Sequence, residues 1–335
     1  MNPRLIATVA VAIATASLSP AALSAAGLRL GMIGLDTSHV PAFTKLLNDP
    51  TDKEFVPGGT VVAAIKGGSP DIESSIRRVD SYTVQLQDKF GVKIVATVEE
   101  LCQQVDAVLI MSVDGRPHLE YARQVIKSGK PLYIDKPIAG SLRDALEIFR
   151  LAKESKVPVF SSSSYRYYPG LVALQKTNVG GIKAVISYGP ATLEPHHPDL
   201  FWYGVHPTEA LFTMMGTGCV TVVRSATPDI DVVTGIWSDG RVGTLQGIRN
   251  AAAPNKVIVF GTKAVAEQAP GGNYAPLVRE IIKFFQTGVS PVPPEETMEL
   301  FAFMEAADES KRQDGAPVKI KDVLSKNSKP QPATK

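Results

Sequence analysis

The stretch VDAVLIMSVDGRPHLEYARQVIKSGKPLYIDKPIAGS, residues 105–141, contains the pattern that decides the fold. It begins with the segment DAVLIMS, residues 106–112, whose continuous apolar centre is of the kind found in strands buried inside parallel sheets. A helix-like segment follows and reaches Gly129, a residue type common just after a helix end. A second apolar run, residues 131–135, comes next, so the stretch predicts two parallel strands joined by a helix.

The same alternation of strands and helices extends on both sides of this unit. It covers residues 27–160, which predicts a doubly wound parallel sheet of the Rossmann type. Beyond residue 180 the strand-like segments follow one another closely, and Asp239-Gly240 predicts a hairpin between two of them. The predicted fold class is therefore α/β, with an N-terminal Rossmann domain and a C-terminal α+β domain whose sheet is mainly antiparallel.

Composition describes a soluble globular chain with a special N-terminus. The formal charge of +2 and the scattered basic residues argue against nucleic acid as a partner. Arg4 precedes an uncharged, apolar run that ends in small residues near Ala26, as in a secretory signal peptide. We expect an exported protein, periplasmic or extracellular, without a stable membrane span after cleavage; a retained anchor is the alternative. Cys102 and Cys219 are expected to be buried free thiols rather than a pair.

These observations divide the chain into four predicted parts. They are a signal peptide at 1–26, a Rossmann-type dinucleotide-binding domain at 27–160, an α+β substrate and oligomerisation domain at 161–324, and a disordered tail at 325–335.

Four stretches, in a fixed order, resemble the Gfo/Idh/MocA oxidoreductases. The first is the opening stretch, with His118 and the Asp135-Lys136-Pro137 tripeptide. The others are SSYRYYPG at 163–170, GVHPTEALFTMMG at 204–216, and the closing segment 293–320. The resemblance implies an NAD(P)-dependent oxidoreductase acting on a hydroxyl or ketone of a sugar, polyol or cyclitol. It also makes a homo-oligomer plausible.

Three residues are the catalytic candidates. The resemblance implies that Lys136 lies at the nicotinamide and touches the reacting hydroxyl, and an ammonium group there would stabilise a developing oxyanion. His206 is suited to proton transfer, with Glu209 as its neighbour three residues later on one helix face. The family usually has Asp four residues before this His, where this chain has Trp202.

The predicted substrate residues are Arg166, Trp202 and Tyr203, the two rings as stacking partners for a sugar. Arg166 could equally form a structural ion pair. The nearby His196, His197 and Asp199 match no standard metal-ligand spacing, so no metal is expected.

The glycine-rich turn departs from the dinucleotide fingerprint. Gly34 takes the position of the first glycine, but Asp36 and His39 take those of the second and third. Asp36 should weaken diphosphate binding unless it turns away, and it could instead cap the following helix. Lys66, after the second strand, favours NADP over NAD. The predicted cofactor-binding residues are Gly34, Thr37, Ser38, Lys66, Ser69, Ser112, His118 and Asp135.

Two other functions remain open on the sequence. One is a non-redox, carbohydrate-binding descendant of the fold that has lost the dinucleotide. The other is a lyase or hydrolase that uses Lys136, His206 and Glu209 without it.

Overall fold

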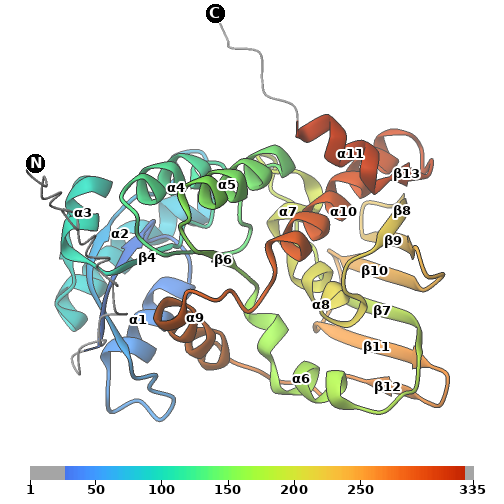
Figure 1. Ribbon diagram of the computed structural model, residues 1–335, viewed down its shortest axis with the longest axis horizontal. Helices are drawn as coiled ribbons and strands as arrows, with labels where there is room; N and C mark the ends of the chain where they lie inside the picture. The colour runs from blue at the N-terminus through green and yellow to red at the C-terminus, as the bar shows by residue number, and fades with distance from the viewer. Residues whose placement is uncertain (1–26, 329–335) are drawn as a thin grey trace, which may run out of the picture.

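The computed structural model describes residues 27–328, and the predicted signal peptide lies outside this range. Two sheets, each with its own helices, lie side by side along the long axis of the molecule (Figure 1). In the described range no helix has the length and apolar character needed to cross a lipid bilayer.

The N-terminal sheet is the predicted Rossmann sheet. Its six strands are parallel, in the order β3-β2-β1-β4-β5-β6. They are β1 (Leu28–Ile33), β2 (Gly59–Ile65), β3 (Lys93–Ile94), β4 (Ala107–Ile110), β5 (Leu132–Ile134) and β6 (Val159–Ser161). The helices between them are α1 (His39–Asn48), α2 (Glu73–Phe90), α3 (Val98–Gln104), α4 (His118–Lys127) and α5 (Leu142–Ser155). Because β1 lies between β2 and β4, the loops after these strands meet over the carboxyl end of β1, where ligands of this fold bind.

The C-terminal sheet has seven strands, in the order β12-β11-β7-β10-β9-β8-β13. Only β7 and β10 pair in parallel; the other pairs are antiparallel. The strands are β7 (Ile182–Pro190), β8 (Cys219–Ala226), β9 (Ile230–Trp237), β10 (Val242–Ile248), β11 (Lys256–Gly261), β12 (Val265–Glu267) and β13 (Val318–Lys319). The predicted hairpin joins β9 and β10, and Gly240 adopts the positive φ of 84° that its turn requires.

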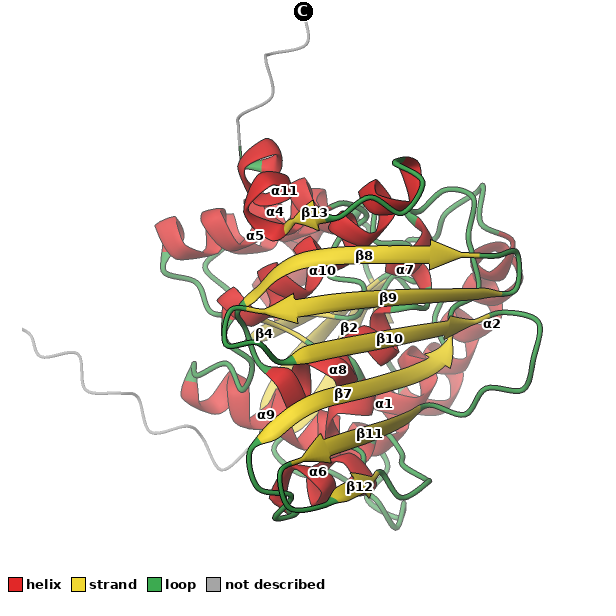
Figure 2. Ribbon diagram, turned by 90° about the vertical axis from the view of Figure 1, so that its right-hand side faces the viewer, coloured by secondary structure: helices red, strands yellow, loops and turns green. Residues whose placement is uncertain are grey.

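Helices cover one face of this second sheet. They include α8 (Val205–Met215) and α10 (Pro294–Arg312), which lie behind the sheet in Figure 2, while its other face is uncovered in that view. The remaining elements are the 3₁₀ turn η1 (Ser164–Tyr167) and the helices α6 (Pro169–Lys176), α7 (Asp199–Trp202), α9 (Ala275–Thr287) and α11 (Ile320–Asn327).

Two details differ from the predicted division of the chain. Helix α9 returns to the N-terminal domain, where Leu277 and Ile281 share a core with Leu30 and Phe43 (Figure 1). Helix α11 continues to Asn327, so residues 325–327 complete a helix rather than begin a tail. Cys102 and Cys219 are buried and unpaired, as predicted.

Candidate active site

Lys136 lies where β5 ends, at the boundary between the two domains. The peptide bond between Lys136 and Pro137 is cis, and only 9% of the lysine is exposed. Its Nζ lies 5.4 Å from the ring centroid of Tyr203, which comes from the C-terminal domain. An ammonium group over an aromatic face is an attractive contact, so this pair connects the two domains at the site.

His118 contacts the backbone next to Lys136. Its Nδ1 lies 3.0 Å from the Pro137 carbonyl oxygen and its Nε2 lies 3.1 Å from that of Ser112. Because both ring nitrogens lie against backbone carbonyl oxygens and the residue is fully buried, His118 holds the Lys136 corner in place instead of contacting a cofactor directly.

His206, at the start of α8, reaches the same place from the other domain. Its Nδ1 lies 2.7 Å from the Ser163 hydroxyl oxygen, and its ring meets Tyr203 edge-on at 5.2 Å. Burial and the nearby charge of Lys136 hold the pKa of His206 well below its ordinary value. Burial also lowers the pKa of Lys136, although the adjacent Asp135 opposes this effect. His206 is therefore a neutral imidazole at neutral pH, able to accept a proton beside a lysine.

His39 adds a group that the sequence analysis did not assign to the site. Its Nδ1 lies 2.6 Å from Asp135 Oδ2, and both side chains are buried. Burial would raise the pKa of Asp135, but His39 and Lys136 together bring it below its ordinary value. Asp135, predicted to bind cofactor, is thus engaged by the histidine that replaces the third glycine.

Glu209 and Arg166 lie in a buried network behind His206. Arg166 Nε lies 2.9 Å from Glu209 Oε1 and its Nη2 lies 2.6 Å from Glu296. The Ser162 hydroxyl and the Ser163 amide also donate to Glu209. With its oxygens engaged in this way, Glu209 positions the segment that carries Ser163 and does not face a substrate. Arg166 takes the structural alternative, an ion pair, instead of the predicted contact with substrate.

The remaining predicted residues of the C-terminal domain lie in different places. Tyr203 is 40% exposed and faces the site, whereas the Trp202 ring packs against His197 at 4.9 Å. His196 lies against Glu194 and Asp71. Asp199 pairs with Arg224 and Lys311, away from these histidines.

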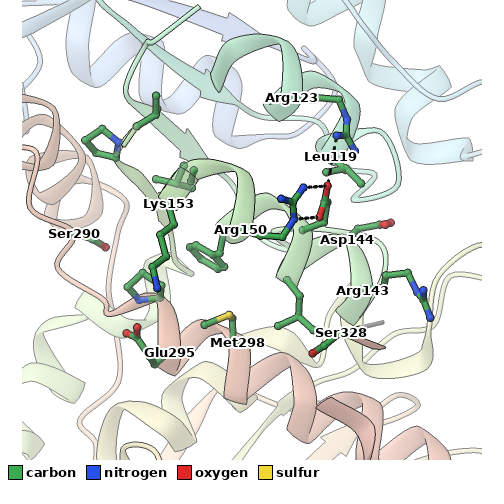
Figure 3. A pocket seen from close by; sticks show the side chains of 18 of the residues that line it. Leu119, Arg123, Arg143, Asp144, Arg150, Lys153, Ser290, Glu295, Met298 and Ser328 are labelled. Carbon is green, nitrogen blue, oxygen red and sulfur yellow. Dashed lines mark hydrogen bonds and ion pairs between the residues drawn. The ribbon is translucent and has the colours of Figure 1, made fainter. Parts of the chain in front are cut away.

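A cavity of about 1010 Å³ lies away from Lys136 and His206. It opens between α5 and α10, as Figure 3 shows. Some of the charged side chains on its wall pair with one another, as Arg150 does with Glu147 at 2.6 Å. Lys136, His206 and Tyr203 do not line it. We therefore define the candidate site by the converging side chains.

The comparison with protein families concerns the N-terminal domain. Residues 28–163 match the GFO_IDH_MocA family, described as an oxidoreductase family with an NAD-binding Rossmann fold. This domain belongs to the Gfo/Idh/MocA oxidoreductases. This agrees with the fold class and with the NAD(P) cofactor class expected from the sequence.

A curated relative of this chain is distant in sequence. A curated protein named "Putative oxidoreductase YceM", from Salmonella typhimurium, is 24% identical over 188 residues, which are 56% of this chain and 52% of that protein. The chain thus matches about half the length of this relative.

Two solved structures from Lactobacillus casei share the fold of this chain. Apo scyllo-inositol dehydrogenase is 14% identical, with a TM-score of 0.73 and coverage of 88% of this chain and 98% of that one. Myo-inositol dehydrogenase in complex with NAD(H) and myo-inositol is 16% identical, with a TM-score of 0.70 and coverage of 88% and 96%.

The turn after β1 retains part of a dinucleotide site. Gly34 has a φ of +84°, and a Cβ there would come within 2.2 Å of the Ser112 hydroxyl, so the tight turn requires glycine. At the start of α1 the amides of Thr37 and Ser38 have no acceptor among residues 27–328. These features suit a diphosphate.

The adenosine half of the site does not fit a dinucleotide in this conformation. Asp36, Ser69, Ser112 and Asp114 are all buried by protein atoms. The Ser69 hydroxyl donates to Asp114 at 2.6 Å, which joins the loop after β2 directly to the loop after β4. No nucleoside can lie between oxygen atoms that are already in hydrogen-bond contact. Lys66, predicted to hold a 2′-phosphate, is exposed and pairs with Asp80 at 2.6 Å.

Proposed function

We propose that the chain is an oxidoreductase that interconverts a hydroxyl and a ketone on a sugar-, polyol- or cyclitol-like molecule. The observation that carries this proposal is the convergence of Lys136 and His206, from two domains, around the exposed ring of Tyr203. The fold of the two inositol dehydrogenases supports the class of substrate.

The two residues would divide the work on the reacting hydroxyl. Oxidation of a carbinol removes a proton and a hydride, and the hydride is the part that NAD(P), the cofactor of the family, takes up. The neutral imidazole of His206 would accept the proton, and Ser163 fixes its orientation through Nδ1. The Lys136 ammonium would stabilise the negative charge that develops on the oxygen.

Tyr203 would contribute to recognition. Its ring is partly exposed beside Lys136 and His206, and the C–H face of a sugar or cyclitol can pack against such a ring. Trp202, which replaces the Asp usual in the family, packs on His197 and so supports the same segment.

The test is reduction of NAD⁺ or NADP⁺, followed at 340 nm, with a panel of polyols, cyclitols and aldoses. We expect at least one of them to be oxidised, and Lys136→Met to abolish the signal. Lys45→Met, an exposed lysine paired with Asp52, is the control that should not change it. A panel on which the wild type gives no signal, or on which Lys136→Met matches it, would contradict the proposal.

The contact of Ser69 with Asp114, which closes the adenosine half of the dinucleotide site, favours a second candidate function. This function is carbohydrate binding without redox chemistry. In that case the panel would raise the melting temperature of the protein without any formation of NAD(P)H.

A further inference from the structure

We infer that the loops around the Asp36 turn form a clamp that competes with the dinucleotide for its adenosine position. The clamp consists of four contacts between side chains. They are Ser75 with Asp36, Ser69 with Asp114, Asp71 with Arg116, and His197 with Asp114. The inference rests on the proposed function only in taking a dinucleotide as the ligand of this crevice.

Asp36 is the centre of the first part of the clamp. The Ser75 hydroxyl donates to its Oδ2 at 2.7 Å, and the Val113 amide donates to its Oδ1 at 2.8 Å. The carboxyl group is fully buried at the position where the fingerprint has its second glycine. Glycine is needed there so that the diphosphate can approach the backbone, and Asp36 instead ties α2 to the loop after β4.

Asp114 is the centre of the second part. It accepts from Ser69 at 2.6 Å and from Arg116, whose guanidinium also reaches Asp71 at 2.7 Å. His197, from the C-terminal domain, places Nε2 3.1 Å from both the Asp114 carboxylate and the Gly115 amide. The clamp therefore joins both domains across the crevice.

The ionised state of Asp114 strengthens the second part of the clamp. Burial alone would raise the pKa of Asp114, but His197, Arg116 and Ser69 hold it below its ordinary value, so this carboxylate stays ionised. A hydrogen bond to an ionised carboxylate is stronger than one between neutral groups, so the contact with Ser69 holds the loop after β2 in place.

Two buried polar atoms indicate that the clamp has a second state. The Ser112 hydroxyl and the Nδ1 of His197 have no hydrogen-bond partner within the described part of the chain, although both residues are more than nine-tenths buried. Such unpaired groups are uncommon and carry a free-energy cost. Both lie at the crevice, where a ligand admitted by an open clamp would supply partners.

The contacts of the clamp can break one by one and be replaced by contacts with water or a ligand. Arg116 and Asp71 are partly exposed, and the serine contacts are single hydrogen bonds. Opening the loop after β2 therefore breaks a few separate polar contacts. Binding of a dinucleotide would have to offset the loss of these contacts.

The experiment measures the dissociation constants of NADH and NADPH by nicotinamide fluorescence. The proteins are the wild type, Asp36→Gly, Ser69→Ala/Ser75→Ala and Asp71→Asn. Asp88→Asn and Ser81→Ala, at exposed positions of α2, are the matched controls. Asp71→Asn removes only an exposed contact, so it is informative even if a buried variant fails to fold.

We expect the clamp variants to bind at least one dinucleotide more tightly than the wild type, by about tenfold for the double serine variant. Asp36→Gly should gain most, Asp71→Asn least, and the controls nothing. The inference would be overturned if the clamp variants bound the dinucleotides no more tightly than the wild type. This holds both when every protein, including the wild type, binds them tightly and when no protein binds them. Variants that gain affinity but oxidise no member of the panel would refute the proposed function and leave the clamp standing.

Discussion

The ammonium nitrogen of Lys136 lies 5.4 Å from the ring centroid of Tyr203, although the two residues belong to different domains. The same ring meets the imidazole of His206 edge-on. The carboxyl end of β5 and the start of α8 therefore present their polar groups to one small volume. A lysine with a lowered pKa beside a neutral histidine is an arrangement suited to proton transfer at a carbinol oxygen.

Lys136 should titrate below an ordinary lysine. Burial disfavours its charged form, so a larger fraction is neutral and nucleophilic at a given pH. We expect the pH midpoint of its carbamylation by cyanate, followed by peptide mass mapping, to lie below that of Lys89, an exposed lysine of α2. Burial slows the carbamylation of Lys136 but does not move the pH midpoint. A midpoint equal to that of Lys89 would show that Lys136 is not perturbed.

His39→Gln should move that midpoint upward. The substitution removes the imidazole that contacts the Asp135 carboxylate. The negative charge of Asp135 then acts more strongly on the adjacent Lys136 and raises the pKa of its ammonium group. His196→Gln, which changes a partly exposed histidine paired with Glu194, is the control and should leave the midpoint in place. Equal midpoints in all three proteins would remove His39 from the site.

Gly34→Ala should destabilise the protein more than Gly129→Ala. Both glycines have positive φ, but a Cβ at Gly34 meets the Ser112 backbone within 2.8 Å, while a Cβ at Gly129 meets nothing within 4 Å. We expect a loss of about 1 kcal/mol in the free energy of unfolding for Gly129→Ala and about 3 kcal/mol for Gly34→Ala. Urea denaturation checks both, and equal losses would mean that the turn is looser than described.

Glu209→Gln should act mainly on stability. It removes a buried charge that Arg166 faces at 2.9 Å, and breaking such a pair costs about 3 kcal/mol. Glu154→Gln, in an exposed pair with Arg150, should cost about 0.5 kcal/mol or less. A Glu209→Gln variant as stable as the wild type but inactive would return Glu209 to the catalytic residues.

Strand periodicity and turn residues were enough to predict both sheets. The continuous apolar runs mark buried parallel strands, and Asp239-Gly240 marks the β9–β10 hairpin. Lys136 could be placed because the end of a parallel strand determines which edge of the sheet it occupies. These are local signals, and each is contained in a short segment.

The closed crevice could not be predicted in the same way. Ser69 meets Asp114 across 45 residues, and His197 meets Gly115 across 82. Single polar contacts of this kind leave no periodic pattern in the sequence. The one available signal was Asp36 in a glycine position, which indicated a problem with the diphosphate but not its partners. The role of His39 was hidden for the same reason, since its partner Asp135 is 96 residues away.

The most direct test of the account is a double-mutant cycle on kcat/KM, using Lys136→Met, His206→Gln and the double variant with a substrate found on the panel. If both residues act on one reacting oxygen, the double variant should lose little more than the worse single variant, within about threefold. Losses that multiply would contradict the account, because they would show that Lys136 and His206 contribute independently.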